Sequence, residues 1–249
     1  MCKAGSFWRI RLRKQVSFLS LVFLVSTLAL LLQPTRTLAA SSSPSHPGLQ
    51  PIRAHDASES CLPLTADSET LLSWHTRSLS NLPDFVASTA RADPATVVGV
   101  FVCRVLALQV AQQPVDDPVF VSEIPGTATQ FRLAAEYGTI GLLAHSQRAG
   151  SEFFGLIAGQ EVHIVYGDGS VKHYMVSEVR HMRSLNPDNP YSDFLDLEHD
   201  GAQLSSVQVF NQVFAKSERV VFQTCIEREG TPTWGRLFVT ATRVFDDTY

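Results

Sequence analysis

The chain has 249 residues, a formal net charge of −4 and 45% apolar residues, which is enough for a sizeable core and too much for a disordered chain. This length fits one domain with extensions or two small domains. A pI near 6.0 argues against a nucleic-acid-binding protein, which would normally carry a basic face. Four cysteines are too few for a disulfide framework, and no two lie close enough for zinc-ribbon spacing.

The N-terminal segment has the pattern of an export signal. Residues 1–39 hold six cations and no acid, and a 17-residue apolar run covers 16–32. Seventeen residues sit at the low edge of the ~17–25 that span a bilayer, so residues 1–39 are either a cleaved signal peptide or a membrane anchor. In both cases the cations stay inside. The remainder, with 14 cations and 24 acids, is then exported to the extracellular face.

The next segments differ in composition from the rest of the chain. Residues 40–67 are rich in Ser and Pro and are predicted to form a flexible spacer. Residues 68–92 have an apolar stripe interrupted at Pro83, which predicts a helical N-terminal extension of one or two short helices packed outside the main domain. The main domain is expected over 93–249.

From Thr96 onward the sequence pattern predicts strands separated by turns. The runs are rich in β-branched and apolar residues, and a Gly-Asp-Gly-Ser sequence at 167–170 predicts a hairpin. The predicted strands are, in chain order, 96–110, 138–145, 161–166, 171–176, 219–226 and 236–244. Short helices are expected at 131–137, 152–158 and 202–210. Many strands with intervening turns indicate a mainly β domain, either a closed barrel or a sandwich.

Three residues at the ends of predicted strands are candidates for a catalytic role. With period-2 alternation, Cys225 faces away from the more apolar face of its strand, toward a groove. His145 ends an apolar strand, and Arg236 opens the last one. Taken singly, each also fits an ordinary structural residue: a buried inert cysteine, a surface histidine and a solvated edge charge.

In combination, these segments resemble the sortase family. The resemblance covers roughly 97–244 and rests on the following motifs: Tyr137 through Ala144-His145, Gly159-Gln160-Glu161-Val162, the Asp-Gly hairpin, Thr224-Cys225, and Gly235-Arg236-Leu237-Phe238-Val239. Sortases are exported cysteine transpeptidases built on a closed eight-stranded β-barrel. The resemblance implies His145, Cys225 and Arg236 as the catalytic set, with Thr224 and Trp234 in substrate-binding or supporting roles. Two departures from the family pattern concern the subclass and the substrate motif: Ala144 stands before the histidine where Gly is more frequent, and Ile226-Glu227 follows the cysteine where Thr-Pro is commoner.

The side chains of His145, Cys225 and Arg236 also suit one another chemically, apart from the resemblance. A thiolate at Cys225 would attack a peptide carbonyl, His145 would move the proton, and Arg236 would stabilise the oxyanion. The expected partners are a protein bearing a sorting-signal peptide and an amine acceptor on the cell envelope or on another protein, with the membrane as a further partner if the N-terminal segment is uncleaved. No nucleic-acid partner is expected. Alternatives are a secreted cysteine peptidase or amidase that uses water, and a non-catalytic surface binding domain.

The other cysteines and histidines lead to further expectations. An oxidising exterior favours a Cys61–Cys103 bridge that leaves Cys225 reactive, with two unpaired buried thiols as the alternative. A two-residue turn at Asp168-Gly169 would place His163 and His173 on opposite faces of their hairpin, so no metal site is expected there.

No cofactor is expected. One acidic loop at 196–201 resembles the opening of a calcium loop, but its twelfth position, Val207, is not the bidentate Glu that such loops require. A solvated acidic loop is therefore favoured, with calcium modulation as the alternative.

Overall fold

The computed structural model describes residues 81–91, 93–189 and 191–245. Within these ranges no helix is long and apolar enough to cross a membrane. The predicted export segment, the spacer and most of the helical extension lie outside the described residues. Their boundaries therefore stay predictions.

Eight strands close into a barrel in the order β10–β9–β4–β3–β2–β1–β5–β6, because β6 pairs back with β10. A β7–β8 hairpin continues the sheet beyond β6. The strands are Val97–Val102 (β1), Leu106–Gln112 (β2), Thr127–Phe131 (β3), Thr139–Leu143 (β4), Glu161–Tyr166 (β5), Val171–Ser184 (β6), Phe194–Asp196 (β7), Ala202–Leu204 (β8), Arg219–Arg228 (β9) and Thr231–Arg243 (β10). The expected mainly β fold with a closed eight-stranded barrel is confirmed, and the sandwich alternative is excluded.

Alternation along each strand fills the barrel interior with apolar side chains. In β9, Val220 and Phe222 join the main core cluster, while Val221 between them lies on the opposite face of the strand. Phe222 is fully buried and packs edge-to-face on Phe153, with ring centroids 5.1 Å apart. The barrel interior is thus filled by one continuous cluster that fixes the faces of β4, β9 and β10.

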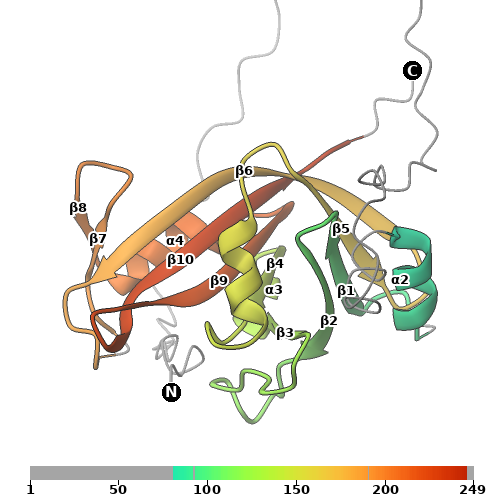
Figure 1. Ribbon diagram of the computed structural model, residues 1–249, viewed down its shortest axis with the longest axis horizontal. Coiled ribbons are helices and arrows are strands. Elements are labelled where there is room, and N and C mark those ends of the chain that lie inside the picture. The colour runs from blue at the N-terminus through green and yellow to red at the C-terminus, as the bar shows by residue number, and fades with distance from the viewer. Residues whose placement is uncertain (1–80, 92, 190, 246–249) are drawn as a thin grey trace, which may run out of the picture. The chain divides into compact units, whose positions relative to one another are not determined.

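Short helices cover parts of the outer surface. They are α2 (Leu82–Thr89), α3 (Arg132–Ala135), the 3₁₀ helix η2 (Ala149–Gly155) and α4 (Ser206–Val213). Pro83 lies in the first turn of α2, where a proline is tolerated, so it begins this helix instead of interrupting one. Phe85 of α2 packs on Phe101 of β1, outside the barrel. In Figure 1, β6 runs from the neighbourhood of α2 at one end to the β7–β8 hairpin at the other.

Several element boundaries differ from the sequence-based expectation. The single run at 96–110 is two strands, because the chain reverses at Arg104, which has a φ of 60°. β6 is 14 residues long and extends well past the predicted end at 176. β3, β7 and β8 were not predicted, since all three are short and contain polar residues. β8 occupies the start of the helix expected at 202–210, and α4 begins only at Ser206.

The β5–β6 hairpin has a three-residue loop, not the two-residue turn that the sequence suggested. Tyr166 N–H donates to the Ser170 carbonyl, and Gly169 has a φ of +84°. A left-handed residue that ends a three-residue loop is typical of hairpins of this length. The register therefore shifts by one residue, so that His163 lies opposite His173 and not opposite Tyr174.

The packing of Phe222 can be tested by truncation. We expect Phe222→Ala to lower the free energy of unfolding by about 3–5 kcal/mol, because it leaves a cavity against Phe153. Phe154→Ala is the control, since this ring is 47% exposed and should cost less than ~1 kcal/mol. Urea unfolding followed by circular dichroism measures both, and equal losses would contradict the described core.

Candidate functional site

The register of two adjacent strands places Cys225 beside Arg236. The two residues are direct cross-strand partners in the antiparallel β9–β10 ladder. Side chains of directly paired residues share a face, so both lie on the outer face of the barrel wall. The prediction that Cys225 faces away from the core side of its strand is confirmed, because Val220, Phe222 and Ile226 pack on the barrel interior.

His145 reaches the same level from the neighbouring strand. The parallel β4–β9 ladder ends with Leu143 opposite Gln223, and its hydrogen bonding continues with Ala144 N–H to the Gln223 carbonyl at 3.2 Å. Ala144 belongs to the interior cluster, so alternation carries His145 to the outer face, level with Cys225. The three residues are therefore brought to one level of adjacent strands. The expectation that Cys225 and Arg236 stand at strand ends is wrong, because β9 continues to Arg228 and β10 begins at Thr231.

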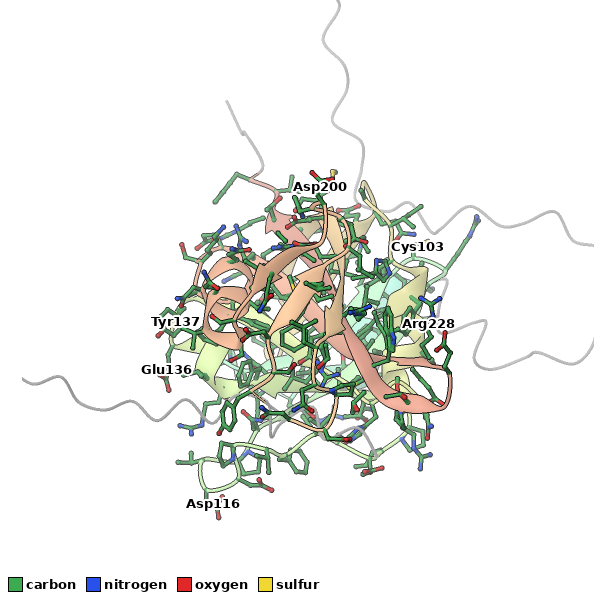
Figure 2. The ribbon with its side chains drawn as sticks, turned by 90° about the vertical axis from the view of Figure 1, so that its left-hand side faces the viewer. Cys103, Asp116, Glu136, Tyr137, Asp200 and Arg228 are labelled. Carbon is green, nitrogen blue, oxygen red and sulfur yellow. The ribbon has the colours of Figure 1, made fainter. Side chains whose placement is uncertain are left out.

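The His145 side chain is mostly buried and lies near a carboxylate. Its Nε2 is 3.6 Å from Oε1 of Glu123, which is largely exposed. Glu123 belongs to the loop between β2 and β3, which extends from the barrel with Asp116 near its outer end (Figure 2). A carboxylate beside an imidazole can orient the ring.

Both Cys225 and Arg236 are buried, which differs from the expected exposed groove. Cys225 is 0% and Arg236 4% exposed. Arg236 Nη1 donates to the carbonyls of Gly235 at 2.8 Å and Thr233 at 3.3 Å. Burial lowers the pKa of Arg236 to about 10, so the guanidinium remains charged at neutral pH. A buried charge of this kind acts more strongly on a nearby oxyanion than one in water.

Thr224 and Gly150 hold the His145 segment against β9. Thr224 Oγ1 donates to the Ala144 carbonyl at 2.9 Å, and Gly150 N–H donates to the His145 carbonyl at 3.0 Å. A Cβ at position 150 would lie 2.7 Å from the His145 carbonyl oxygen and would press on the Thr224 hydroxyl. Glycine is therefore required where η2 crosses this point. Thr224 faces the barrel interior, and it supports the site by holding the segment before His145 in place.

Trp234, the second predicted supporting residue, lies near the β9–β10 connection. It is partly buried, and the Arg228 guanidinium sits over its ring at 5.1 Å from the centroid. The ladder register shifts between Thr231 and Gly235, so Trp234 lies in an irregular stretch one residue before Gly235. The pair covers the hairpin end of the site.

Gln223 is a site residue that the sequence reasoning passed over. It lies two residues before Cys225, on the same face, and is fully buried. Neither of its amide atoms has a hydrogen-bond partner within the described part of the chain. Burying a polar group without a partner is costly, which indicates that this amide has another use. The signal in the sequence was a polar residue inside an otherwise apolar strand.

Both described cysteines are disulfide-bonded, so neither Cys103 nor Cys225 is a free thiol in this structure. The expectation of a resting free thiol at Cys225 is therefore wrong. Counting cysteines cannot determine which sulfurs meet, because pairing depends on geometry in the fold. Cys61 lies outside the described residues, and the Cys61–Cys103 pairing stays a prediction.

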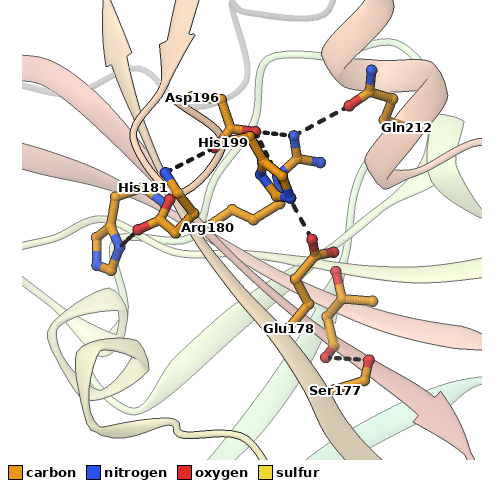
Figure 3. A network of polar contacts seen from close by, with 9 residues as sticks. Ser177, Glu178, Arg180, His181, Asp196, His199 and Gln212 are labelled. Atoms are coloured by element: carbon orange, nitrogen blue, oxygen red, sulfur yellow. Dashed lines mark hydrogen bonds and ion pairs between the residues drawn. The ribbon is translucent and has the colours of Figure 1, made fainter. Parts of the chain in front are cut away.

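A polar network lies along β6 and ties the β7–β8 hairpin to α4 (Figure 3). Arg180 of β6 binds the buried carboxylate of Asp196 through Nε at 3.0 Å and through Nη2, and it also donates to Gln212 of α4 at 3.2 Å. His199 Nδ1 is 3.0 Å from the same carboxylate. Burial raises the pKa of Asp196, but the hydrogen bond and charge of Arg180 outweigh this and leave it below its ordinary value.

The acidic loop at 196–201 is the turn of this hairpin. Glu198 accepts from the His181 backbone N–H at 2.6 Å and contacts the His181 ring at 2.7 Å. Asp200 and Gly201 have positive φ values and make the turn. Two of the carboxylates considered as calcium ligands are thus engaged within the protein, and calcium modulation stays an alternative prediction.

The prediction that His163 and His173 lie on opposite faces is wrong. They are directly paired across β5 and β6, their ring centroids are 5.0 Å apart, and Glu161 shares their face. The cause is the three-residue loop, since a one-residue slip of register moves a whole strand face. Burial lowers the pKa of His163 below its ordinary value, against the opposing charge of Glu161.

No family model and no curated protein matches the sequence. Solved structures similar to this chain include three sortases. Sortase A from Listeria monocytogenes is 15% identical, with a TM-score of 0.38 over 61% of this chain and 89% of that one. Sortase A from Corynebacterium diphtheriae is 12% identical, with a TM-score of 0.43 over 64% and 65%. Sortase C-1 from Actinomyces oris is 13% identical, with a TM-score of 0.42 over 66% and 80%.

Gly150 provides a test of how the site is held together. We expect Gly150→Ala to lower the free energy of unfolding by about 1–3 kcal/mol and to shift the NMR signals of the His145 imidazole, because its methyl group displaces the His145 carbonyl. Gly155→Ala, in the same 3₁₀ helix, meets one Val105 methyl at 3.2 Å and serves as the control. Unchanged His145 signals in Gly150→Ala would refute the contact.

The Arg180–Asp196 pair predicts a pH dependence of stability. The pKa of Asp196 is lower in the folded state than the ordinary 3.8. Its stabilising contribution is therefore full above that ordinary value and is lost as the pH falls through the folded-state value. We expect Asp196→Asn to cost about 3–5 kcal/mol at neutral pH, since Arg180 loses its carboxylate, and to flatten the decline in stability below about pH 4.

Urea unfolding between about pH 6 and about pH 3 measures this slope. Asp188→Asn is the control, because Asp188 lies in an exposed loop away from the pair. An identical slope in wild type and Asp196→Asn would show that the pair does not contribute to acid sensitivity.

Proposed function

We propose that this chain is a sortase-like cysteine transpeptidase that acts on an extended sorting-signal peptide. The observation that carries the proposal is the alignment of His145, Cys225 and Arg236 at one level of three adjacent strands. A nucleophile, a base and a fixed cation are the groups that acyl transfer through a thioester requires. The exported location proposed from the N-terminal segment agrees with an acceptor on the cell envelope.

The reaction begins with reduction of the Cys225 disulfide, which needs a thiol reductant as co-reactant. The Cys225 thiol then gives its proton to His145, and the thiolate attacks a peptide carbonyl carbon. The tetrahedral intermediate collapses by breaking the peptide C–N bond, and the imidazolium returns its proton to the departing amine. The acyl part remains bound to Cys225 as a thioester.

Transfer completes the cycle. An acceptor amine attacks the thioester carbonyl while His145 takes its proton, and the C–S bond breaks to regenerate the thiolate. Arg236 stabilises the oxyanion in both steps, since its guanidinium is charged, buried and adjacent to the sulfur-bearing residue. The buried Gln223 amide supplies a donor and an acceptor for the backbone of an extended peptide.

One observation favours a second candidate, a non-catalytic surface binding domain that retains the barrel. Cys225 is disulfide-bonded, and a structural disulfide would keep this sulfur inert. The two functions differ in their response to reductant: the transpeptidase is activated by it, whereas the binding domain is not. A peptidase or amidase that uses water differs from the transpeptidase in its acceptor alone.

The proposal predicts a graded loss of activity on substitution. After reduction, Cys225→Ser should lose thioester formation, His145→Gln should lose about 10²–10⁴-fold in kcat/KM, and Arg236→Lys about 10²–10³-fold, because a point charge does not reproduce the guanidinium fork. A peptide library incubated with the reduced protein and a competing amine, followed by mass spectrometry, measures the acyl adduct and its transfer product.

Cys103→Ser is the control, because it changes the other described cysteine and should keep the activity. A hydrolysed product with a free carboxylate, in place of the product joined to the amine, would assign the peptidase or amidase function. Peptide cleavage retained by Cys225→Ser would overturn the proposed mechanism, and no adduct from any peptide in the reduced protein would favour the binding domain.

A further inference from the structure

A cluster of three ligand-type side chains lies on the outer face of the β5–β6 hairpin. Glu161 and His163 are two residues apart on β5 and share a face, and His173 is the direct cross-strand partner of His163. One candidate ligand atom from each residue lies within 4.8 Å of the others. Three donors from two strands therefore converge on one point.

The contacts within the cluster leave imidazole nitrogens available. His173 Nδ1 is 2.9 Å from Glu161 Oε1, and His163 Nε2 is 3.9 Å from Glu161 Oε2. The other His163 nitrogen, Nδ1, is buried and has no hydrogen-bond partner within the described residues. An ion held among these side chains would bind the nitrogens that lie nearest Glu161, which are Nε2 of His163 and Nδ1 of His173.

The surroundings hold one ligand firmly and leave the other two adjustable. His163 is 12% exposed, and its ring lies 5.9 Å from that of Phe101. Glu161 and His173 are more exposed, at 53% and 33%, so their side chains can close the remaining distance to an ion. The site is thus closed by buried side chains around His163 and open to solvent at Glu161 and His173. Such surroundings suit an ion that keeps one open coordination position.

We propose that Glu161, His163 and His173 form a site for a divalent transition-metal ion, with zinc as the ion tested. Two imidazoles and one carboxylate with an open fourth position form a donor set that zinc accepts in a tetrahedral arrangement. Calcium and magnesium prefer oxygen ligands and should not compete.

The ion would join β5 to β6 close to their connecting loop. It lies far from the proposed catalytic residues. Arg236 pairs with Met182 of β6, and His173 is nine residues away from Met182 on the same strand. At ~3.3 Å per residue this is roughly 30 Å along the strand. The site would therefore stabilise the hairpin without supplying an ion to Cys225. It is independent of the proposed function.

The site is tested on the full chain, prepared without a polyhistidine tag and with its disulfides intact. We expect zinc to bind with 1:1 stoichiometry in calorimetry and to raise the melting temperature, and equal concentrations of calcium or magnesium to leave it unchanged. His173→Ala and Glu161→Gln should each weaken zinc binding at least ~10-fold. Both residues are partly exposed, so the variants should still fold.

His181→Ala is the matched control, because His181 also pairs with a glutamate, Glu198, but belongs to a different strand pair. It should keep the zinc affinity of wild type. Cobalt substitution should give visible d–d bands without a thiolate charge-transfer band. No zinc-dependent shift, an equal loss in His181→Ala, full binding in His173→Ala, or a thiolate band would each overturn the assignment.

Discussion

The proposed site depends on the register of three neighbouring strands. β4 runs parallel to β9 and β10 runs antiparallel to it. The residue that follows β4 and Arg236 within β10 therefore both lie level with Cys225. A slip of one residue in either ladder would turn one of the three side chains to the opposite face. The continuous apolar core prevents such a slip, because Phe222 and its neighbours must remain inside the barrel. Packing in the interior thus determines chemistry on the outer face.

Burial gives this arrangement its electrostatic character. Arg236 is held among backbone carbonyls and retains its charge, while Gln223 is enclosed with an amide that the described protein leaves unsatisfied. Groups kept in this state are usually compensated by a ligand or used in a reaction. The disulfide at Cys225 adds a redox condition to the proposed mechanism, because the proposed nucleophile becomes available only after reduction.

Much of this could be read from the sequence, and the failures have physical causes. Alternation along β9 was sufficient to predict which way Cys225 faces, and turn signals marked most strands. The burial of Cys225 and the pairing of sulfurs could not be predicted, since both depend on contacts between segments distant in sequence. The predicted hairpin register was wrong because the loop has three residues, 167–169, and not only Asp168 and Gly169. Gly169 ends this loop in a left-handed conformation. That single residue decided whether His163 and His173 could share an ion.

The most direct test of the account is the alkylation rate of Cys225 in the reduced protein, compared between wild type and His145→Gln by peptide mass mapping. If the register places the imidazole beside the sulfur, removing the base should slow alkylation at least ~10-fold near neutral pH, because the thiolate is the reacting form. Using the ratio of the two rates cancels the effect of burial on access. Equal rates in the two proteins would contradict the claim that these strands assemble a catalytic pair.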